Sequence, residues 1–197
     1  MKSLNLTANL NCLSNTIYFL KKHFPVILDL GLVAALGRVI QLGGFGEIES
    51  WMNIALEVVI ETARLLIFLY ALGLASVRVG ALRISRFFIQ KENRKLHLIV
   101  AIKKIKKQWV SILVNFICFL LIAGVINYLI DLLAYQTCLF LKLKKDGILS
   151  SSSSEWTILL FFKNLSVIPL TLVFEAVFLL WITNKFKKRE EAAVSCN

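Results

Sequence analysis

Residues with reactive side chains are scarce in this sequence. Its 197 residues include two histidines, two prolines and four cysteines, and the cysteines show no spacing typical of a disulfide framework or a metal site. A serine or cysteine nucleophile needs a base close by, and both histidines, His23 and His97, lie outside the long apolar segments described below. The sequence therefore predicts no enzyme, no catalytic residue, no metal site and no cofactor.

Apolar residues dominate instead. Hydrophobic residues make up 58% of the chain, compared with about 45–50% in an average soluble domain. Four segments are long enough to cross a hydrocarbon layer about 30 Å thick, which takes roughly 20 helical residues: 24–42, 54–81, 109–134 and 156–182. Because lipid offers no hydrogen-bond partner to the backbone, such segments form helices. The expected fold is all-α, a polytopic integral membrane protein with four transmembrane helices in a single membrane domain, 1–197.

The distribution of Lys and Arg predicts the orientation. The segment 1–23, the connection 82–108 and the tail 183–197 are basic, whereas the connection 43–53 carries two acids and no base. The positive-inside rule then places both termini and the middle connection in the cytoplasm. The N-terminal segment lacks the apolar core of a secretory signal, so we expect the first span to remain as an anchor. The composition suits a bacterial inner (plasma) membrane.

The N-terminal segment has the pattern of an amphipathic interfacial helix. Its apolar residues recur every three or four positions: Leu6, Leu10, Leu13, Ile17, Leu20 and Phe24. Two interpretations are open. The helix lies on the inner leaflet of the membrane, or it packs against the cytoplasmic face of the helix bundle.

The middle connection has a similar pattern with more charge. One apolar stripe precedes the third span: Leu98, Ile102, Ile105 and Trp109. Four lysines occupy the rest of this stretch and are expected at anionic lipid headgroups of the inner leaflet: Lys103, Lys104, Lys106 and Lys107. Each lysine near such a surface contributes about 1 kcal/mol. Cytoplasmic loops of membrane proteins are basic by default, so the net charge of +11 does not indicate nucleic-acid binding.

Ionisable residues within the apolar segments fall into two layers by depth, estimated from a rise of about 1.5 Å per helical residue. A charge in this position costs on the order of 2.5–3.5 kcal/mol and normally has a partner. The outer layer contains three acids, three bases and an amide: Arg38, Glu57, Glu61, Arg64, Asn127, Asp131 and Lys163. Because these charges balance, we expect an interhelical polar network that fixes the helix register.

The inner layer contains two acids without an obvious partner, Asp29 and Glu175. Asn164 and Thr171 share a helix face with Glu175, and Pro169 favours a kink in that helix because proline has no backbone N–H. Proton relays and cation sites in membranes are built in this way. These two acids, with Thr171 and Asn164, are therefore the candidate intramembrane functional residues.

Asp29 and Arg38 point in different directions. They are nine residues apart in one predicted helix, and nine steps of about 100° place them on opposite faces. One neighbouring helix cannot satisfy both charges. Either protein surrounds the first helix, or one of the two side chains reaches toward an interface.

Glu57, Glu61 and Arg64 resemble, over a few residues, the paired-glutamate and arginine motif of intramembrane CAAX-type proteases. That family combines the motif with histidines on later helices, and here both histidines are expected at the cytoplasmic surface. Undecaprenyl-pyrophosphate phosphatases pair a similar glutamate motif with a glycine- and serine-rich phosphate loop, which this chain lacks. Neither resemblance assigns a role to these residues.

Two functions fit the sequence. The first is a non-enzymatic membrane subunit or scaffold that binds membrane lipids and either a protein partner or further copies of itself. The second is a small proton- or ion-coupled transporter or channel that uses the intramembrane acids.

Overall fold

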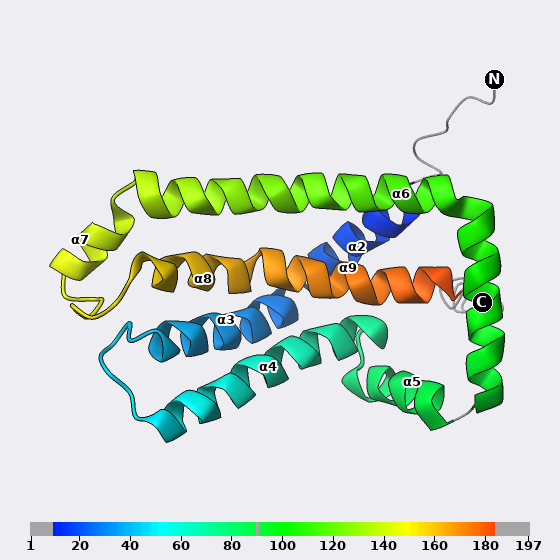
Figure 1. Ribbon diagram of the computed structural model, residues 1–197, viewed down its shortest axis with the longest axis horizontal. Helices are drawn as coiled ribbons and strands as arrows, with labels where there is room; N and C mark the ends of the chain where they lie inside the picture. Colours follow the sequence, from blue (N-terminus) through cyan, green and yellow to red (C-terminus); the bar gives the residue numbers. More distant parts are fainter. Residues whose placement is uncertain (1–9, 90, 184–197) are drawn as a thin grey trace. The chain divides into compact units, whose positions relative to one another are not determined.

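The computed structural model describes residues 10–89 and 91–183, except for the side chains of 91–97, and contains helices and no strand within these ranges (Figure 1). The helices are α2 (Asn11–Lys22), α3 (Phe24–Gln41), α4 (Ser50–Leu72), α5 (Val77–Ile89), α6 (Lys91–Gln136), α7 (Leu139–Lys145), α8 (Glu155–Leu165) and α9 (Val167–Ile182). The expected all-α fold is confirmed for the described residues. Most of the N-terminal segment 1–23 before α2 and nearly all of the tail 183–197 lie outside them.

Several of these helices can cross a membrane. Among the described residues, three stretches are long and apolar enough: Phe24–Gln41, Leu98–Gln136 and Glu155–Ile182. By length and composition α4 and α5 qualify together as a fourth, broken span, and these two helices are bent by 85°. The chain therefore has the features of an integral multi-pass membrane protein.

The surface of these helices is apolar. Large hydrophobic side chains are exposed along α3, α4 and α6, for example Val33, Val58 and Leu121. Water does not favour so many exposed apolar side chains on neighbouring helices. Lipid does, because a helix that is hydrophobic all round suits a membrane environment.

The structure corrects the expected span 54–81, because α4 ends at Leu72 and the chain turns before α5 begins. Leu74 and Ala75 in this turn have positive φ angles of 53° and 78°. The Val79 N–H donates to the Ser76 hydroxyl at 3.4 Å, and the Arg83 guanidinium donates to the carbonyl of Leu72 at the end of α4. These bonds satisfy helix-end groups that a continuous helix would pair internally.

Helix α6 contains a sharp bend where the third span was expected to begin. Gln108 departs from helical geometry, with φ −125° and ψ 30°, and Figure 1 shows the change of direction along α6. The part before Gln108 carries the basic amphipathic stretch, and the part after it is apolar. A bend is therefore present where the elbow was expected.

The last span is kinked, as Pro169 led us to expect. Helix α8 ends at Leu165, Ser166 has non-helical angles, and α9 begins at Val167. Proline cannot donate to the Leu165 carbonyl. The Ser166 N–H and hydroxyl both donate to the Phe162 carbonyl, at 3.1 and 2.7 Å.

The chain divides into two compact units. The first consists of residues 1–22, 68–120 and 173–197. Its described core is rich in aromatic rings, and Phe119 of α6 stacks on Phe174 of α9 with ring centroids 4.2 Å apart. Phe116 meets Phe174 and Phe178 edge-on.

The second unit consists of residues 23–67 and 121–172. One cluster of buried side chains joins α3, the end of α6, α7 and α8: Val39, Ile130, Ala134, Phe140, Leu149, Ile158 and Leu159. Ala34, Ile60 and Ala63 form a smaller cluster between α3 and α4. Both clusters hold in place the helices that carry the polar residues described next.

Candidate functional site

Polar side chains of α3 and α4 meet within the second unit. Arg38 donates to Glu57, with its Nη1 3.0 Å from Glu57 Oε2. The amide of Gln41 donates to the same carboxylate oxygen at 2.7 Å. Gln41 also accepts a hydrogen bond from Arg38, so these three side chains form a closed group.

A second group extends the network to α8. Arg64 pairs with Glu61 one turn earlier, with its Nη1 2.5 Å from Glu61 Oε1. Its Nε and Nη2 both donate to Oδ1 of Asn164, at 3.3 and 2.9 Å. Glu61 also lies 4.0 Å from Nη2 of Arg38. The network therefore continues from α3 through α4 to α8.

Small residues let these helices approach closely enough for the polar groups to meet. A Cβ on Gly37 would lie 2.9 Å from Cγ1 of Ile60, and a Cβ on Gly31 would lie 3.2 Å from the carbonyl oxygen of Asn164. Glycine in α3 thus faces both α4 and α8. Close approach through small residues is typical of helices packed in membranes.

The charges of this network balance, with two carboxylates and two guanidinium groups. The arginine side chains are mostly covered, 17% exposed for Arg38 and 21% for Arg64, whereas those of Glu57 and Glu61 are 46% and 54% exposed. Each guanidinium has a carboxylate partner and an amide partner. The arrangement can hold three helices in one register without a bound ion to neutralise it.

The network differs in membership from the expected one. The structure brings together Arg38, Glu57, Glu61 and Arg64, but it does not include Asn127, Asp131 or Lys163. These three side chains are half-buried and take no ion pair or side-chain hydrogen bond within the described ranges. In α6, Ile130 and Ala134 point into the core, and Asn127 and Asp131 flank that buried face.

Two residues of the network were not expected in it. Gln41 was missed, although it lies three residues after Arg38 and therefore on the same side of α3. Asn164 was expected to act with the inner acids. It is buried instead beside Arg64, and its amide nitrogen donates to the Leu160 carbonyl at 2.7 Å.

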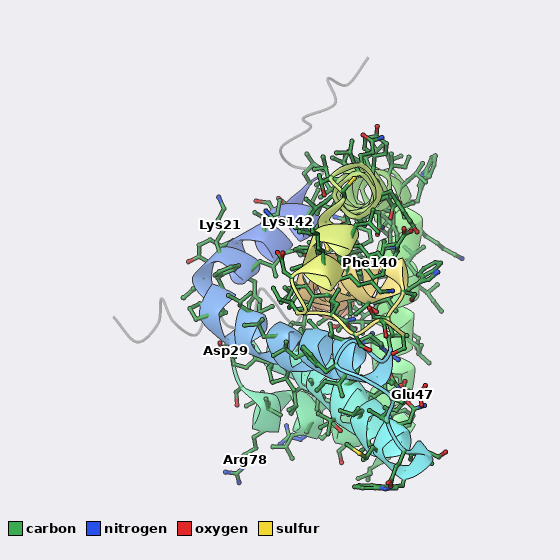
Figure 2. All side chains as sticks on the ribbon, turned by 90° about the vertical axis from the view of Figure 1, so that its left-hand side faces the viewer. Lys21, Asp29, Glu47, Arg78, Phe140 and Lys142 are labelled. Carbon is green, nitrogen blue, oxygen red and sulfur yellow. The ribbon has the colours of Figure 1, made fainter. Side chains whose placement is uncertain are left out.

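The two inner acids lie on the surface. Asp29 is exposed on α3 (Figure 2), on the face opposite Arg38, and Glu175 is exposed on α9. Neither has an ion pair or side-chain hydrogen bond among the residues that the structure describes. Thr171 donates to the carbonyl of Val167 in its own helix at 2.8 Å. Asp29 and Glu175 belong to different units.

Lys104 differs from the other lysines of the basic stretch. Lys103, Lys106 and Lys107 are exposed, as expected for contact with headgroups. The Lys104 ammonium donates to the carbonyl of Trp181 and lies 4.4 Å from the centroid of the Trp181 ring. Trp181 is 9% exposed, so this lysine contacts a largely buried aromatic side chain at the end of α9.

The described residues of helix α2 pack on protein along one side, as in the second interpretation of the N-terminal segment. Its buried side is Cys12, Leu13, Thr16 and Phe19, whereas Ile17 of the expected apolar stripe is exposed. The Leu13 N–H donates to Oδ1 of Asn115 in α6 at 2.9 Å, and Asn115 is fully buried. Burial raises the pKa of the Cys12 thiol to about 12, partly offset by the nearby Lys104 charge.

Comparison of the chain with protein-family models, curated proteins and solved structures gives no match. Among the side chains that the structure describes, those of residues 10–89 and 98–183, no group of three or more His, Cys, Asp and Glu is placed to hold a metal ion.

Proposed function

We propose that this chain is a non-enzymatic multi-pass membrane protein that acts as a subunit or scaffold of a larger membrane assembly. The observation that supports this most directly is the exposed position of Asp29 on α3. It lies within a helix long and apolar enough to span a membrane, and it lacks a polar partner among the described residues.

A carboxylate in that position is costly when only lipid surrounds it. Insertion scales give on the order of 2.5–3.5 kcal/mol for an acid at the centre of a span, and such residues normally pair with another group. Asp29 lies five residues after Phe24, so it is about 7.5 Å along the helix axis from the start of α3. Another protein that covers this face would supply the missing partner.

The polar network of α3, α4 and α8 fits the same proposal. Its two acids and two bases are paired with one another, and Asn164 completes the hydrogen bonds of Arg64. Such a network selects one helix packing. We therefore assign it a structural role, in which it presents a fixed outer surface to other chains.

Transport is the weaker alternative. A proton or ion path would place Asp29 and Glu175 inside the bundle, around water. Both acids are exposed instead, which favours contact with partners over transport through the chain.

We further propose four crossings with both termini in the cytoplasm of a bacterial inner membrane. In this topology α4 forms the second crossing alone. Helix α5 then lies at the cytoplasmic interface, where its arginines, such as Arg86, meet anionic lipid and its exposed Phe88 and Ile89 enter the apolar layer.

Mild-detergent extraction of the full chain from its native membrane, followed by mass determination, tests the proposal. We expect a complex clearly heavier than the 22.3 kDa chain. A lone monomer that conducts ions after reconstitution in liposomes, and loses conduction in the Asp29→Asn and Glu175→Gln variants, would contradict it.

A further inference from the structure

Helix α3 carries an exposed stripe with the spacing of a helix-packing seam. Val26, Val33 and Leu36 are 40%, 46% and 47% exposed, and Asp29 is exposed between them. The intervals of three, four and three residues are those of the a and d positions of a left-handed helix pair. We call these four residues the α3 seam.

The α3 seam lies away from the face that holds α3 in its own unit. The buried residues of α3 are Ile27, Gly31, Ala34, Ala35, Gly37 and Val39. Of these, Gly31 faces α8 and Gly37 faces α4. Most contacts of α3 within the unit are thus made away from the seam, and Gly37, one turn after Val33, packs on Ile60 at its edge. Among the described residues, the side chains of the seam stay exposed.

We propose that the α3 seam docks one transmembrane helix of a different protein, and that this helix carries a lysine or arginine opposite Asp29. The inference rests on the proposed function and names the chemistry of the partner. Charge complementarity is its main support, because a base at this depth and the exposed carboxylate would each relieve the cost of the other in lipid. The apolar seam residues supply the packing around that pair.

A second copy of this chain fits the seam poorly. Two copies inserted in the same orientation would pair symmetrically about an axis along the membrane normal. Their two Asp29 carboxylates would then face each other at one depth, and like charges in a medium of low dielectric constant repel strongly. The seam therefore selects a heteromeric partner.

Site-specific photocrosslinking in native membranes tests the docking. The full chain is expressed with the photoreactive residue p-benzoylphenylalanine in place of Val33, and a matched variant has it in place of Val58, an equally apolar exposed residue of α4 in the same unit. We expect the Val33 probe to form an adduct with a single membrane protein, through a peptide that is an apolar span with Lys or Arg within one turn of the crosslink. The Val58 probe should not capture that protein.

Substitutions of Asp29 in the Val33-probe chain test the charge pair. Asp29→Asn should lower the adduct yield by about tenfold or more, because it leaves the partner's base unpaired in lipid, whereas Asp29→Glu should retain most of it. Asp29 is exposed, so neither change should alter the protease resistance of the chain itself. An unchanged yield with Asp29→Asn overturns the pairing with a base.

Adducts with lipid alone, with a second copy of this chain, or with a peptide that has no Lys or Arg also overturn the inference. The mass of the extracted wild-type chain separates this failure from failure of the proposed function. A heavy complex together with lipid-only adducts rejects the α3 seam and leaves the subunit role standing. A lone chain in detergent rejects both.

Discussion

Two N–H groups of Arg64 converge on a single oxygen of Asn164, at 3.3 and 2.9 Å. The bond joins α4 to α8, which are far apart in the sequence. Apolar contact distinguishes poorly between one neighbour and another when lipid is equally apolar. Directional bonds of this kind therefore do most to select which helices pair and in which register.

Replacing Asn164 should weaken the fold. Asn164→Leu leaves two N–H groups of the mostly covered Arg64 side chain without their acceptor, so we expect the free energy of unfolding to fall by about 1–3 kcal/mol. Asn164→Asp keeps the acceptor and should remain closer to wild type. Unfolding in mixed detergent micelles measures both. Asn127→Leu is the matched control with a change near zero, and equal losses for the two leucine variants would contradict the assignment.

The Arg38–Glu57 pair should show measurable coupling. A double-mutant cycle with Arg38→Met and Glu57→Gln should give about 0.6–1.7 kcal/mol, the range found for interhelical polar bonds in membranes. The control cycle uses Asp131→Asn and Lys163→Met, two oppositely charged residues that the structure does not join. Its coupling should be indistinguishable from zero. A larger value for the control pair than for the Arg38 pair would reverse our interpretation of the network.

Gly80 should be essential for the turn between α4 and α5. A Cβ at this position would collide with the carbonyl oxygen of Leu69, so Gly80→Ala should destabilise the first unit by about 2 kcal/mol or more. A Cβ on Gly124 of α6 would meet nothing within 4 Å, and Gly124→Ala should be neutral or should stabilise by up to about 1 kcal/mol. Thermal unfolding of the two variants compares them directly, and similar melting temperatures would count against the close packing.

The Cys12 thiol should be inert at neutral pH and its burial should affect stability at high pH. Maleimide should modify the exposed Cys138 and spare Cys12 at pH 8, as read by peptide mapping, because a pKa of about 12 keeps Cys12 protonated.

The unfolded chain loses this proton near the ordinary pKa of 9.0, whereas the native chain holds it up to about 12. The free energy of unfolding should therefore fall with rising pH across that interval. Cys12→Ala should remove this part of the slope, and an unchanged slope would refute it.

The sequence contains enough to place Asp29 and Arg38 on opposite faces of one helix, because helical periodicity is local. No local pattern in the sequence identifies the partner of Arg64, since the depth of a residue along its helix does not say which neighbouring helix lies beside it. The end of α4 at Leu72 was missed for a related reason. The apolar composition continues through Val79, and the turn depends on contacts between Gly80 and Leu69 that only the folded chain makes.

Lys104 and Lys103 are neighbours with the same charge. Substituting each in turn therefore distinguishes packing within the protein from attraction to lipid headgroups. Lys104 bonds to the Trp181 carbonyl and lies over its ring, and a cation–π contact that is largely shielded from water contributes about 1–2 kcal/mol. Lys104→Met should therefore lower the free energy of unfolding by about that amount, whereas Lys103→Met should change it by less than about 0.5 kcal/mol. The opposite order is expected for stabilisation by anionic lipid, where Lys103→Met should have the larger effect.

Anionic phosphatidylglycerol added to the detergent should raise the melting temperature of the wild type through the exposed lysines. Lys103→Met should reduce that rise, because each headgroup lysine contributes about 1 kcal/mol, and Lys104→Met should leave it intact. Trp181→Leu completes the test by a double-mutant cycle with Lys104→Met. Equal effects of the two lysine substitutions on both measurements would mean that Lys104 acts through lipid after all.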